Sequence, residues 1–394
     1  MSQWVQQRID GFGRVVTGKT PSSERPNEFG TEAPFLTPSD IPGTQKFVTT
    51  DRFLSQTGMD AHKRLVLPTG STSVVCIGAT IGKCCMTYQL TVTNQQINSI
   101  VPDVTRHSPN FVYYLSTTLK DALVNFAGGS ATPIINKSTF SGIKVIAPGL
   151  IEQRKIAAVL STYDDLIENN RRRIALLERM AEQLYREWFV RFRFPGYQDA
   201  KFEKGVPRDW KKGHFSDLCA LQRGFDLPDS QITPGAYPVV ASTSIKAYHS
   251  TFKVEPPVIT TGRSGSLGEV LWINEKAWPL NTALFVKSFQ GNSPFFIFHT
   301  LRSMHLENFN SGAGVPSLNR NHLSSLPVSI PPPALQEAFA AQVAPMQALR
   351  ESLASACAEL TKTRDLLLPR LISGKLRVDE LDIQFPPSMQ AEGA

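Results

Sequence analysis

The chain has 394 residues, which is long enough for two domains that each bury a core of their own. Charged residues make up only 19% of it and hydrophobic residues 41%, a balance that excludes a largely disordered protein. The formal net charge of +7 favours an anionic partner. Ribosomal, membrane-surface and simply basic proteins share this balance, so charge alone does not select among them.

The sequence shows no targeting or membrane segment. Met1–Arg8 lack the apolar core of a signal peptide, and there is no run of about 18 apolar residues anywhere. The five cysteines are odd in number and form no Cys-x-x-Cys pair, which argues against a zinc site or a disulfide framework. We therefore expect a cytoplasmic protein with reduced thiols, in which the adjacent Cys84 and Cys85 are small core residues of a strand.

Residues 1–150 predict a first module of mixed α+β structure. The run 73–77 is rich in β-branched residues and resembles a strand, residues 78–82 form a turn bounded by glycines, and residues 110–115 begin a short helix.

The turn that ends at Lys83 resembles a phosphate-binding loop. Three residues separate its glycines where the motif has four, and Cys84 stands where the motif needs a metal-binding Ser or Thr. A matching turn later in the chain, Gly265–Gly268, is followed by Glu269, whose charge would repel phosphate. We therefore predict that both segments are turns joining two strands and that neither is a nucleotide site.

Residues 151–193 predict a long helix with one apolar seam. Apolar or small side chains recur at alternating steps of four and three residues, which is the heptad spacing of helices that pack together. Asn170 interrupts the seam, and a run of arginines at 171–173 lies outside it. The seam positions are Ile156, Leu160, Tyr163, Ile167, Ile174, Leu177, Ala181, Leu184 and Trp188.

Residues 194–333 predict a second α+β module. The run 257–260 resembles a strand, residues 262–268 a turn, and residues 294–298 the start of a short helix. These segments follow one another in the same order as those of the first module.

Residues 334–374 predict a second long helix, and residues 375–394 a C-terminal tail. Arg350 and Arg364 interrupt the seam of this helix. Pro345 conflicts with a regular helix because proline removes a backbone hydrogen bond and clashes with the preceding turn, so we expect a bend or a late start there. The seam positions are Phe339, Val343, Met346, Leu353, Cys357, Leu360, Leu367 and Leu371.

The two halves of the chain are two copies of one sequence repeat. A shift of 183 residues aligns the end of the first module and the first helix with the end of the second module and the second helix. A shift of 206 aligns the beginnings of the modules, so their middles differ in length as well as in most residues. This pattern is typical of two modules that share a scaffold but contact different binding partners. The matched positions include Pro133–Lys137 with Pro316–Arg320, Pro148 with Pro331, Gln153 with Gln336, Trp4 with Trp210, and Gly18 with Gly224.

The two seams predict that the helices cover each other. Each seam extends over about 40 residues, or roughly 60 Å of helix, which is too long for one small module to cover. Because each helix ends one copy of the repeat, an approximate two-fold axis between the copies would make the pair antiparallel. We therefore predict two globular α+β modules in a pseudo-two-fold arrangement, separated by two long antiparallel coiled-coil helices.

Three segments together resemble the specificity subunits of type I restriction-modification enzymes. The segment Pro148–Ala157 leads into the first long helix. The segment Pro331–Glu337 is a degenerate repeat of it, and Leu371–Leu376 ends the second helix. The resemblance covers nearly the whole chain up to about Val378. The second copy departs from the pattern because it lacks the glutamate before its glutamine and has Phe339 where isoleucine is usual.

The resemblance implies a role for each part of the chain. The modules 1–150 and 194–333 would be target recognition domains that each read one half of a split double-stranded DNA sequence, and the helices 151–193 and 334–374 would set the gap between the halves. The helices would also dock two methyltransferase subunits, which use S-adenosylmethionine, and restriction subunits that use ATP and Mg would join them. The complex would be a site-specific adenine methyltransferase and ATP-dependent endonuclease, while this chain would hold no active site, cofactor or metal.

Two other classes of protein remain as alternatives. A stand-alone methyltransferase or nuclease is disfavoured, because no Asn or Asp precedes a Pro-Pro-aromatic run and the seven histidines show no metal spacing. A coiled-coil scaffold without DNA reading would explain the helices. It would not explain why two modules with matching edges have divergent middles.

Basic and amide residues in the predicted loops are the candidates for DNA contact. Arg and Lys suit guanine edges, Asn and Gln suit adenine, and all four residue types can bind phosphate. For Asn136 and Asn319 the sequence leaves open the alternative that they cap loops. The candidates are Lys19, Lys63, Arg64, Lys83, Asn136, Lys137, Lys246, Lys253, Arg263, Ser264, Asn319 and Arg320.

Overall fold

The computed structural model divides into two compact units. The first unit consists of Met1–Arg172 with Ala354–Ala394, and the second of Arg173–Leu353. The two long helices, α5 and α9, are both divided between the units, so that each unit contains a part of each helix. The helices are α5 (Leu150–Tyr185), which continues as a π-helical turn (Arg186–Val190), and α9 (Pro333–Ile372). The residues that the structure describes are 4–43, 45–127, 133–312 and 314–390.

The main sheet of the first unit has four antiparallel strands in the order β2-β9-β6-β7. Helix α2 packs against β6 and β7 on one face, where Val74 and Cys84 join the main core of the unit. On the other face, Val75 and Cys85 pack with the buried Ile41 in a second, smaller cluster. Both faces are therefore covered, which explains why β6 is buried along its whole length. The strands are β2 (Gly13–Thr17), β6 (Thr72–Val75), β7 (Cys84–Met86) and β9 (Ile97–Pro102).

A smaller sheet and a strand pair complete the first unit. The smaller sheet has the order β3-β5-β4-β8, in which β4 and β8 are parallel, and β1 pairs with β10. Its strands are β3 (Phe29–Gly30), β4 (Ala33–Leu36), β5 (Phe53–Leu54) and β8 (Val92–Thr93), and the pair is β1 (Val5–Arg8) with β10 (Lys144–Ala147). The short helices are α1 (Gln56–Ala61), α2 (Pro109–Thr117), α3 (Lys120–Phe126) and α4 (Lys137–Gly142).

The second unit repeats this topology. Its main sheet has the order β14-β20-β17-β18, its smaller sheet β16-β15-β19 contains the parallel pair β15 and β19, and β13 pairs with β21. The main strands are β14 (Ala220–Arg223), β17 (Val258–Gly262), β18 (Val270–Ile273) and β20 (Ala283–Ser288). The other strands are β11 (Phe202–Glu203), β12 (Val206–Pro207), β13 (Lys211–His214), β15 (Tyr237–Val240), β16 (Ile245–His249), β19 (Trp278–Pro279) and β21 (Pro327–Ile330). The short helices are α6 (Phe215–Leu218), α7 (Pro294–Ser303) and α8 (Arg320–Ser324).

The elements predicted inside the modules are present. The strands predicted at 73–77 and 257–260 are β6 and β17, and the short helices predicted at 110–115 and 294–298 are α2 and α7. Both glycine turns join paired strands, β6 with β7 and β17 with β18, which confirms that they are turns.

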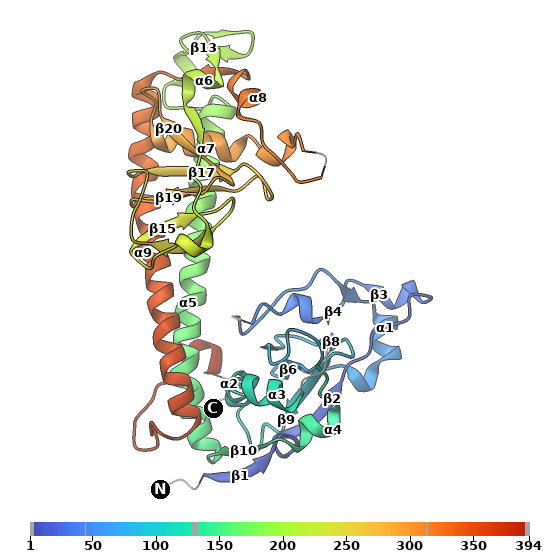
Figure 1. Ribbon diagram of the computed structural model, residues 1–394. Helices are drawn as coiled ribbons and strands as arrows, with labels where there is room; N and C mark the ends of the chain where they lie inside the picture. The colour runs from blue at the N-terminus through green and yellow to red at the C-terminus, as the bar shows by residue number, and fades with distance from the viewer. Residues whose placement is uncertain (1–3, 44, 128–132, 313, 391–394) are drawn as a thin grey trace. The chain divides into compact units, whose positions relative to one another are not determined.

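Helices α5 and α9 lie side by side in both units (Figure 1). In the first unit Asp164 contacts Arg364 and Ile167 contacts Cys357, so the helices run in opposite directions. The residues of the predicted seam are all buried or half-buried. They are Ile156, Leu160, Tyr163, Ile167, Ile174, Leu177, Ala181, Leu184 and Trp188 on α5, and Phe339, Val343, Met346, Leu353, Cys357, Leu360, Leu367 and Leu371 on α9.

The two arginines that interrupt the seam of α9 are paired with acids of α5. In the first unit Arg364 Nη1 lies 2.5 Å from Asp164 Oδ1, and in the second unit Arg350 Nη1 lies 3.4 Å from Glu178 Oε1. A charge that is removed from water needs such a partner, because an unpaired one would cost several kcal/mol.

Pro345 neither delays nor ends the second long helix. α9 begins at Pro333 and continues through Pro345 to Ile372, so the expectation of a late start is wrong. Proline at this position removes the hydrogen bond to the carbonyl of Ala341. Because Ala341 and Pro345 are both exposed, water can replace the missing donor at that carbonyl.

Across the described ranges, we find no helix that is long and apolar enough to cross a membrane. The same residues contain no group of three or more His, Cys, Asp or Glu side chains that could hold a metal ion. The five cysteines are free thiols, and Cys84 and Cys85 are buried in β7, as predicted for core residues of a strand.

Candidate nucleic-acid interface

Four strand ends of the first module meet at one edge of its main sheet. β2 and β6 end there, and β7 and β9 begin there, because neighbouring strands are antiparallel. We call this the first loop edge and define it as residues 17–20, 76–83, 94–97 and 133–137. Loops that are distant in sequence are thereby brought to one side of a rigid sheet, which is the usual place of binding residues.

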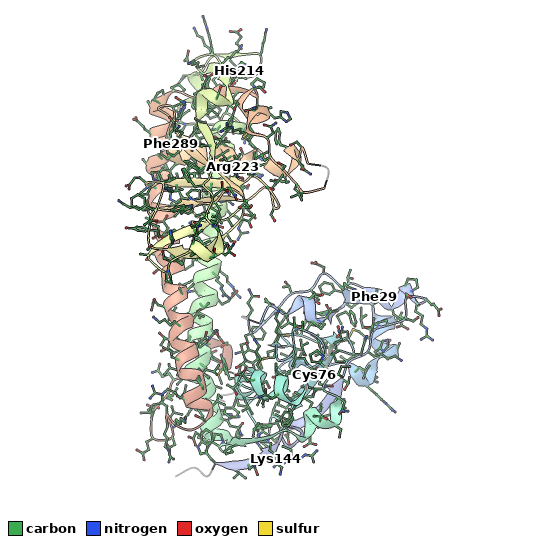
Figure 2. The ribbon with its side chains drawn as sticks, viewed as in Figure 1. Phe29, Cys76, Lys144, His214, Arg223 and Phe289 are labelled. Carbon is green, nitrogen blue, oxygen red and sulfur yellow. The ribbon has the colours of Figure 1, made fainter. Side chains whose placement is uncertain are left out.

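Backbone hydrogen bonds hold the first loop edge together. The N–H of Gly78 donates to the carbonyl of Pro133 at 3.0 Å, and the N–H of Ile135 donates to the carbonyl of Cys76 at 2.8 Å. Cys76 itself lies within the module, 1% exposed (Figure 2). These bonds place the segment that precedes α4 beside the turn that carries Lys83.

The second module has the same arrangement at its second loop edge, defined as residues 223–226, 263–269, 280–282 and 316–320. The N–H of Gly265 donates to the carbonyl of Pro316 at 2.9 Å, and the N–H of Leu318 donates to the carbonyl of Arg263 at 2.8 Å. The structure therefore brings together Arg263 and Ser264 with the segment of Asn319 and Arg320.

Two matched glycines make these edges possible. A Cβ atom at Gly18 would lie 2.2 Å from the carbonyl oxygen of Thr93, and one at Gly224 would lie 2.2 Å from the carbonyl oxygen of Leu280. Only glycine allows the backbone to approach a neighbouring strand so closely. This packing gives a physical reason for the match of these two positions in the sequence repeat.

The first loop edge is lined by neutral hydrogen-bonding side chains together with lysines. Thr20 Oγ1 donates to Gln95 Oε1 at 2.6 Å, and the hydroxyl of Thr17 donates to Asn98 Oδ1 at 2.6 Å. Lys83 is half-buried and Lys137 is exposed. Amide and hydroxyl groups of this kind can meet base edges, and lysines can meet phosphate.

The second loop edge carries a charged network instead. Arg263 Nε donates to the backbone carbonyl of Asn281 at 2.8 Å, and the Asn281 side chain donates to Asp226. Arg223, at the exposed end of β14, donates to the same carboxylate at 3.3 Å (Figure 2). The bond from Nε fixes the plane of the Arg263 guanidinium and leaves its two terminal nitrogens to reach a ligand.

Asn136 and Asn319 act as helix caps. Asn136 Oδ1 accepts a hydrogen bond from the N–H of Thr139 at 2.9 Å, and Asn319 Oδ1 accepts one from the N–H of Asn321 at 3.0 Å. Each begins a short helix, α4 or α8. The capping alternative is thus confirmed for both, and an additional contact with DNA stays a prediction.

The structure places Lys63 and Arg64 away from the first loop edge. Both are exposed on a 3₁₀ turn, and Arg14 donates to the carbonyl of Arg64 at 3.1 Å. Arg14 lies three residues before Thr17 on β2, which is about 10 Å along a strand. Any contact of Lys63 and Arg64 with DNA would therefore differ from that of Lys83.

Two lysines near the loop edge of the second module contact other side chains of that module. Lys246 Nζ forms an ion pair with Asp229 at 2.5 Å, and Lys253 Nζ lies 4.8 Å from the ring centroid of Trp278. In the same region Ser242 Oγ donates to the carbonyl of Ser264 at 2.8 Å, which fixes the loop that follows β15 against the second loop edge.

Several residues of these edges are not among the candidates predicted from the sequence. Arg223 could have been found, because it directly precedes the matched Gly224. Asp226, Asn281 and Gln95 gave no local signal, because they reach the edges only through pairing of strands that are distant in sequence.

The chain matches a family model described as "Type I restriction modification DNA specificity domain" over residues 1–179 and 207–348. It therefore belongs to that family. It is similar to the specificity subunit of the type I restriction enzyme MjaIX of Methanocaldococcus jannaschii, with 27% identity over 96% of this chain and 94% of the relative. It is also 36% identical to the specificity subunit of the type I restriction enzyme HindI of Haemophilus influenzae, over 43% of this chain and 38% of that protein.

A crystal structure of the S subunit of a type I restriction-modification system from M. genitalium has the same fold. The TM-score is 0.62, the match covers 94% of this chain and 96% of that one, and the sequences are 15% identical. The chain is thus a specificity subunit of a type I restriction-modification system, which acts on DNA together with other subunits of the system. The scaffold and stand-alone enzyme alternatives are not favoured.

Proposed function

We propose that each module reads one half of a bipartite double-stranded DNA target through its own loop edge. The observation that carries this proposal is that two modules with one strand topology present different side chains at the same edge of the sheet. The first edge offers Thr20 with Gln95, whereas the second offers Arg223 with Arg263. Amide groups suit adenine and arginine suits guanine, so the two edges would select different base sequences.

We further propose that the chain recognises the target without catalysing a reaction. Two methyltransferase subunits would dock on α5 and α9 and use S-adenosylmethionine to methylate adenine, and restriction subunits would join them and use ATP and Mg to cut DNA. The helices would also set the length of the spacer between the half-sites. The complex would act in the cytoplasm, where the target DNA is present.

An exchange of modules tests this function. Residues 20–145 are replaced by the corresponding segment of another member of the family, and the methylated sites in the host genome are mapped with the original and the exchanged gene. We expect one half-site to change while the other half-site and the spacer stay the same. A change in both half-sites, or methyl transfer by the purified chain without any partner, would contradict the proposal.

A further inference from the structure

Thr20 and Asp226 occupy the same position in the two loop edges. Thr20 lies two residues after Gly18. Asp226 lies two residues after Gly224, which the sequence repeat matches with Gly18. Both glycines lie in close contact with the backbone of a neighbouring segment, so the chain leaves the sheet in the same way in both modules.

Backbone hydrogen bonds identify a second pair of equivalent positions, Gln95 and Asn281. In each module the matched glycine and the residue after it donate to two carbonyls that are four residues apart on the neighbouring segment. The bonds are Gly18 to Ile97 (3.2 Å) and Lys19 to Thr93 (2.9 Å) in the first module, and Gly224 to Ala283 (3.0 Å) and Phe225 to Pro279 (2.8 Å) in the second. Gln95 and Asn281 each lie midway between the two acceptors, so the structure makes them counterparts.

The side chains at these two positions are hydrogen-bonded to each other in both modules. Thr20 Oγ1 donates to Gln95 Oε1 at 2.6 Å, and Asn281 Nδ2 donates to Asp226 Oδ1. Gln95 and Asp226 are exposed, while Thr20 and Asn281 are half-buried. We call Thr20 with Gln95 the first amide pair and Asp226 with Asn281 the second amide pair. Each amide is held by its neighbour, and each pair has a side chain that a ligand can reach.

The first amide pair matches the major-groove edge of adenine. An amide oxygen can accept two hydrogen bonds, so Gln95 Oε1 keeps one acceptor site in addition to its bond from Thr20. Gln95 Nε2 donates to no other described residue and keeps both of its N–H groups. Adenine presents the N6 amino donor beside the N7 acceptor. Gln95 can therefore form two hydrogen bonds with adenine while Thr20 holds the plane of its amide.

The second amide pair has a different chemistry, because a carboxylate only accepts hydrogen bonds. Asp226 Oδ1 accepts from Asn281 and from Arg223 Nη2, the latter at 3.3 Å. Asp226 Oδ2 accepts from no other described residue. The side chains of Arg223 and Asp226 are 50% and 71% exposed. The second loop edge thus presents guanidinium donors directly beside a free carboxylate acceptor.

A G·C base pair presents the complementary pattern in the major groove. Guanine offers the N7 and O6 acceptors, and cytosine beside it offers the N4 amino donor. These groups match the donors of Arg223 and the free oxygen of Asp226. An A·T pair would place its N6 donor against the arginine and the O4 oxygen of thymine against the carboxylate, so like would meet like. The second amide pair therefore favours G·C over A·T.

We propose that these equivalent positions determine the base preference of the two modules. Gln95, oriented by Thr20, reads an adenine in one half-site. Asp226, oriented by Asn281 and acting with Arg223, reads a G·C pair in the other half-site. The inference rests on the proposed function, because it requires that the loop edges contact DNA. It adds that one pair of positions in the repeat carries the choice of base in both modules.

Exchange of the second amide pair for the first tests the inference. Arg223→Thr, Asp226→Thr and Asn281→Gln together give the second loop edge the side chains of the first. The variant and the wild type are each produced with the methyltransferase subunit in a host strain that lacks both genes, and the methylated sites of the genome are mapped. We expect one G·C position of one half-site to become A·T while the other half-site stays the same. Two identical maps would overturn the inference.

A single substitution separates base reading from a general effect of charge. Asp226→Asn can donate as well as accept, so it no longer excludes thymine. Asp229→Asn makes the same change three residues further on and frees Lys246 from its ion pair. The complex with the methyltransferase subunit is used to select from a library of random DNA duplexes. We expect the preference for cytosine at one position to fall about tenfold in Asp226→Asn and to persist in Asp229→Asn. The same loss in both variants would overturn the inference.

The role of Thr20 is tested by asking whether its hydroxyl is sufficient. Thr20→Val keeps the shape of the side chain and removes the donor, and Thr20→Ser keeps the donor. In the same selection we expect the preference for adenine to fall in Thr20→Val and to be retained in Thr20→Ser, with equal melting temperatures. An unchanged preference in Thr20→Val would overturn the positioning role.

The same selection distinguishes failure of the inference from failure of the proposed function. If the wild-type complex selects no sequence from the library, the proposed function fails and the inference fails with it. If the wild-type complex selects a bipartite sequence that none of these substitutions alters, the proposed function stands and the inference alone is wrong.

Discussion

Gln153 Oε1 accepts a hydrogen bond from the backbone N–H of Ser108 at 3.1 Å, and the same side chain donates to the carbonyl of Pro148 at 2.8 Å. In the second unit Gln336 makes the matching pair of bonds, to Ser293 at 2.9 Å and to Pro331 at 3.0 Å. One buried glutamine thus joins the start of a long helix to the start of the short helix that covers the sheet. The duplicated glutamine is therefore a joint between the helix pair and each module.

Replacing either glutamine by leucine should loosen this joint. Gln153→Leu removes the buried hydrogen bonds to the N–H of Ser108 and the carbonyl of Pro148, so we expect the free energy of unfolding to fall by about 1–3 kcal/mol. Gln336→Leu should have an effect of the same size on the second unit. Urea unfolding measures both, with the exposed Gln183→Leu as control. An equal and small change in all three variants would show that the joint contributes little.

Breaking the ion pair within the helix seam should destabilise the first unit. Asp164 also accepts the hydroxyl of Tyr114, and both charged side chains are less than one-fifth exposed. Arg364→Met leaves the carboxylate of Asp164 without its counter-charge, and we expect a loss of about 3 kcal/mol. The double variant with Asp164→Leu should recover much of that loss. A double-mutant cycle in urea unfolding checks this, and strictly additive losses would argue against a direct pair.

His299 should make the protein sensitive to acid. Its pKa is lowered to about 3 in the folded chain by burial and by Arg302, while a histidine in the unfolded chain titrates near 6.5. The unfolded state therefore binds more protons between these values, and stability is lost as the pH falls below about 6.5. The slope from this residue is about 1.4 kcal/mol per pH unit.

A substitution with a matched control separates that contribution from other acid effects. We expect His299→Tyr to flatten the fall in melting temperature between pH 6.5 and pH 5, whereas the exposed His322→Tyr should leave the fall as it is. The same pH dependence in the wild type and in His299→Tyr would contradict the assignment.

Arg263 should contribute to one half-site only. Arg263→Ala removes a guanidinium whose orientation is fixed by the carbonyl of Asn281, and we expect binding of the cognate DNA to weaken by about 1–3 kcal/mol. If Arg263 contacts a base, the discrimination at one position of one half-site should be lost in a set of oligonucleotides with single base changes. Equal weakening for all sequences, together with a smaller salt dependence, would assign Arg263 to phosphate.

Features that are local or duplicated can be predicted from the amino-acid sequence. Heptad spacing predicts both long helices, because a seam of period 3.5 stabilises helices that pack together. The repeat matches Gly18 with Gly224 and Gln153 with Gln336, and in the structure the two members of each pair make equivalent contacts. The comparison of the two copies therefore predicted more of the structure than any single motif did.

The residues that meet at the loop edges follow only from the packing of the whole chain. Arg223 approaches Asn281 through pairing of β14 with β20, and Lys46 reaches Ser161 from a loop distant in sequence. Strand order and loop path depend on long-range packing, which leaves no periodic trace in the chain. For the same reason the matched positions Ala181 and Arg364 do not by themselves predict the pockets that they line, because the effect of a side chain's volume depends on the residues packed around it.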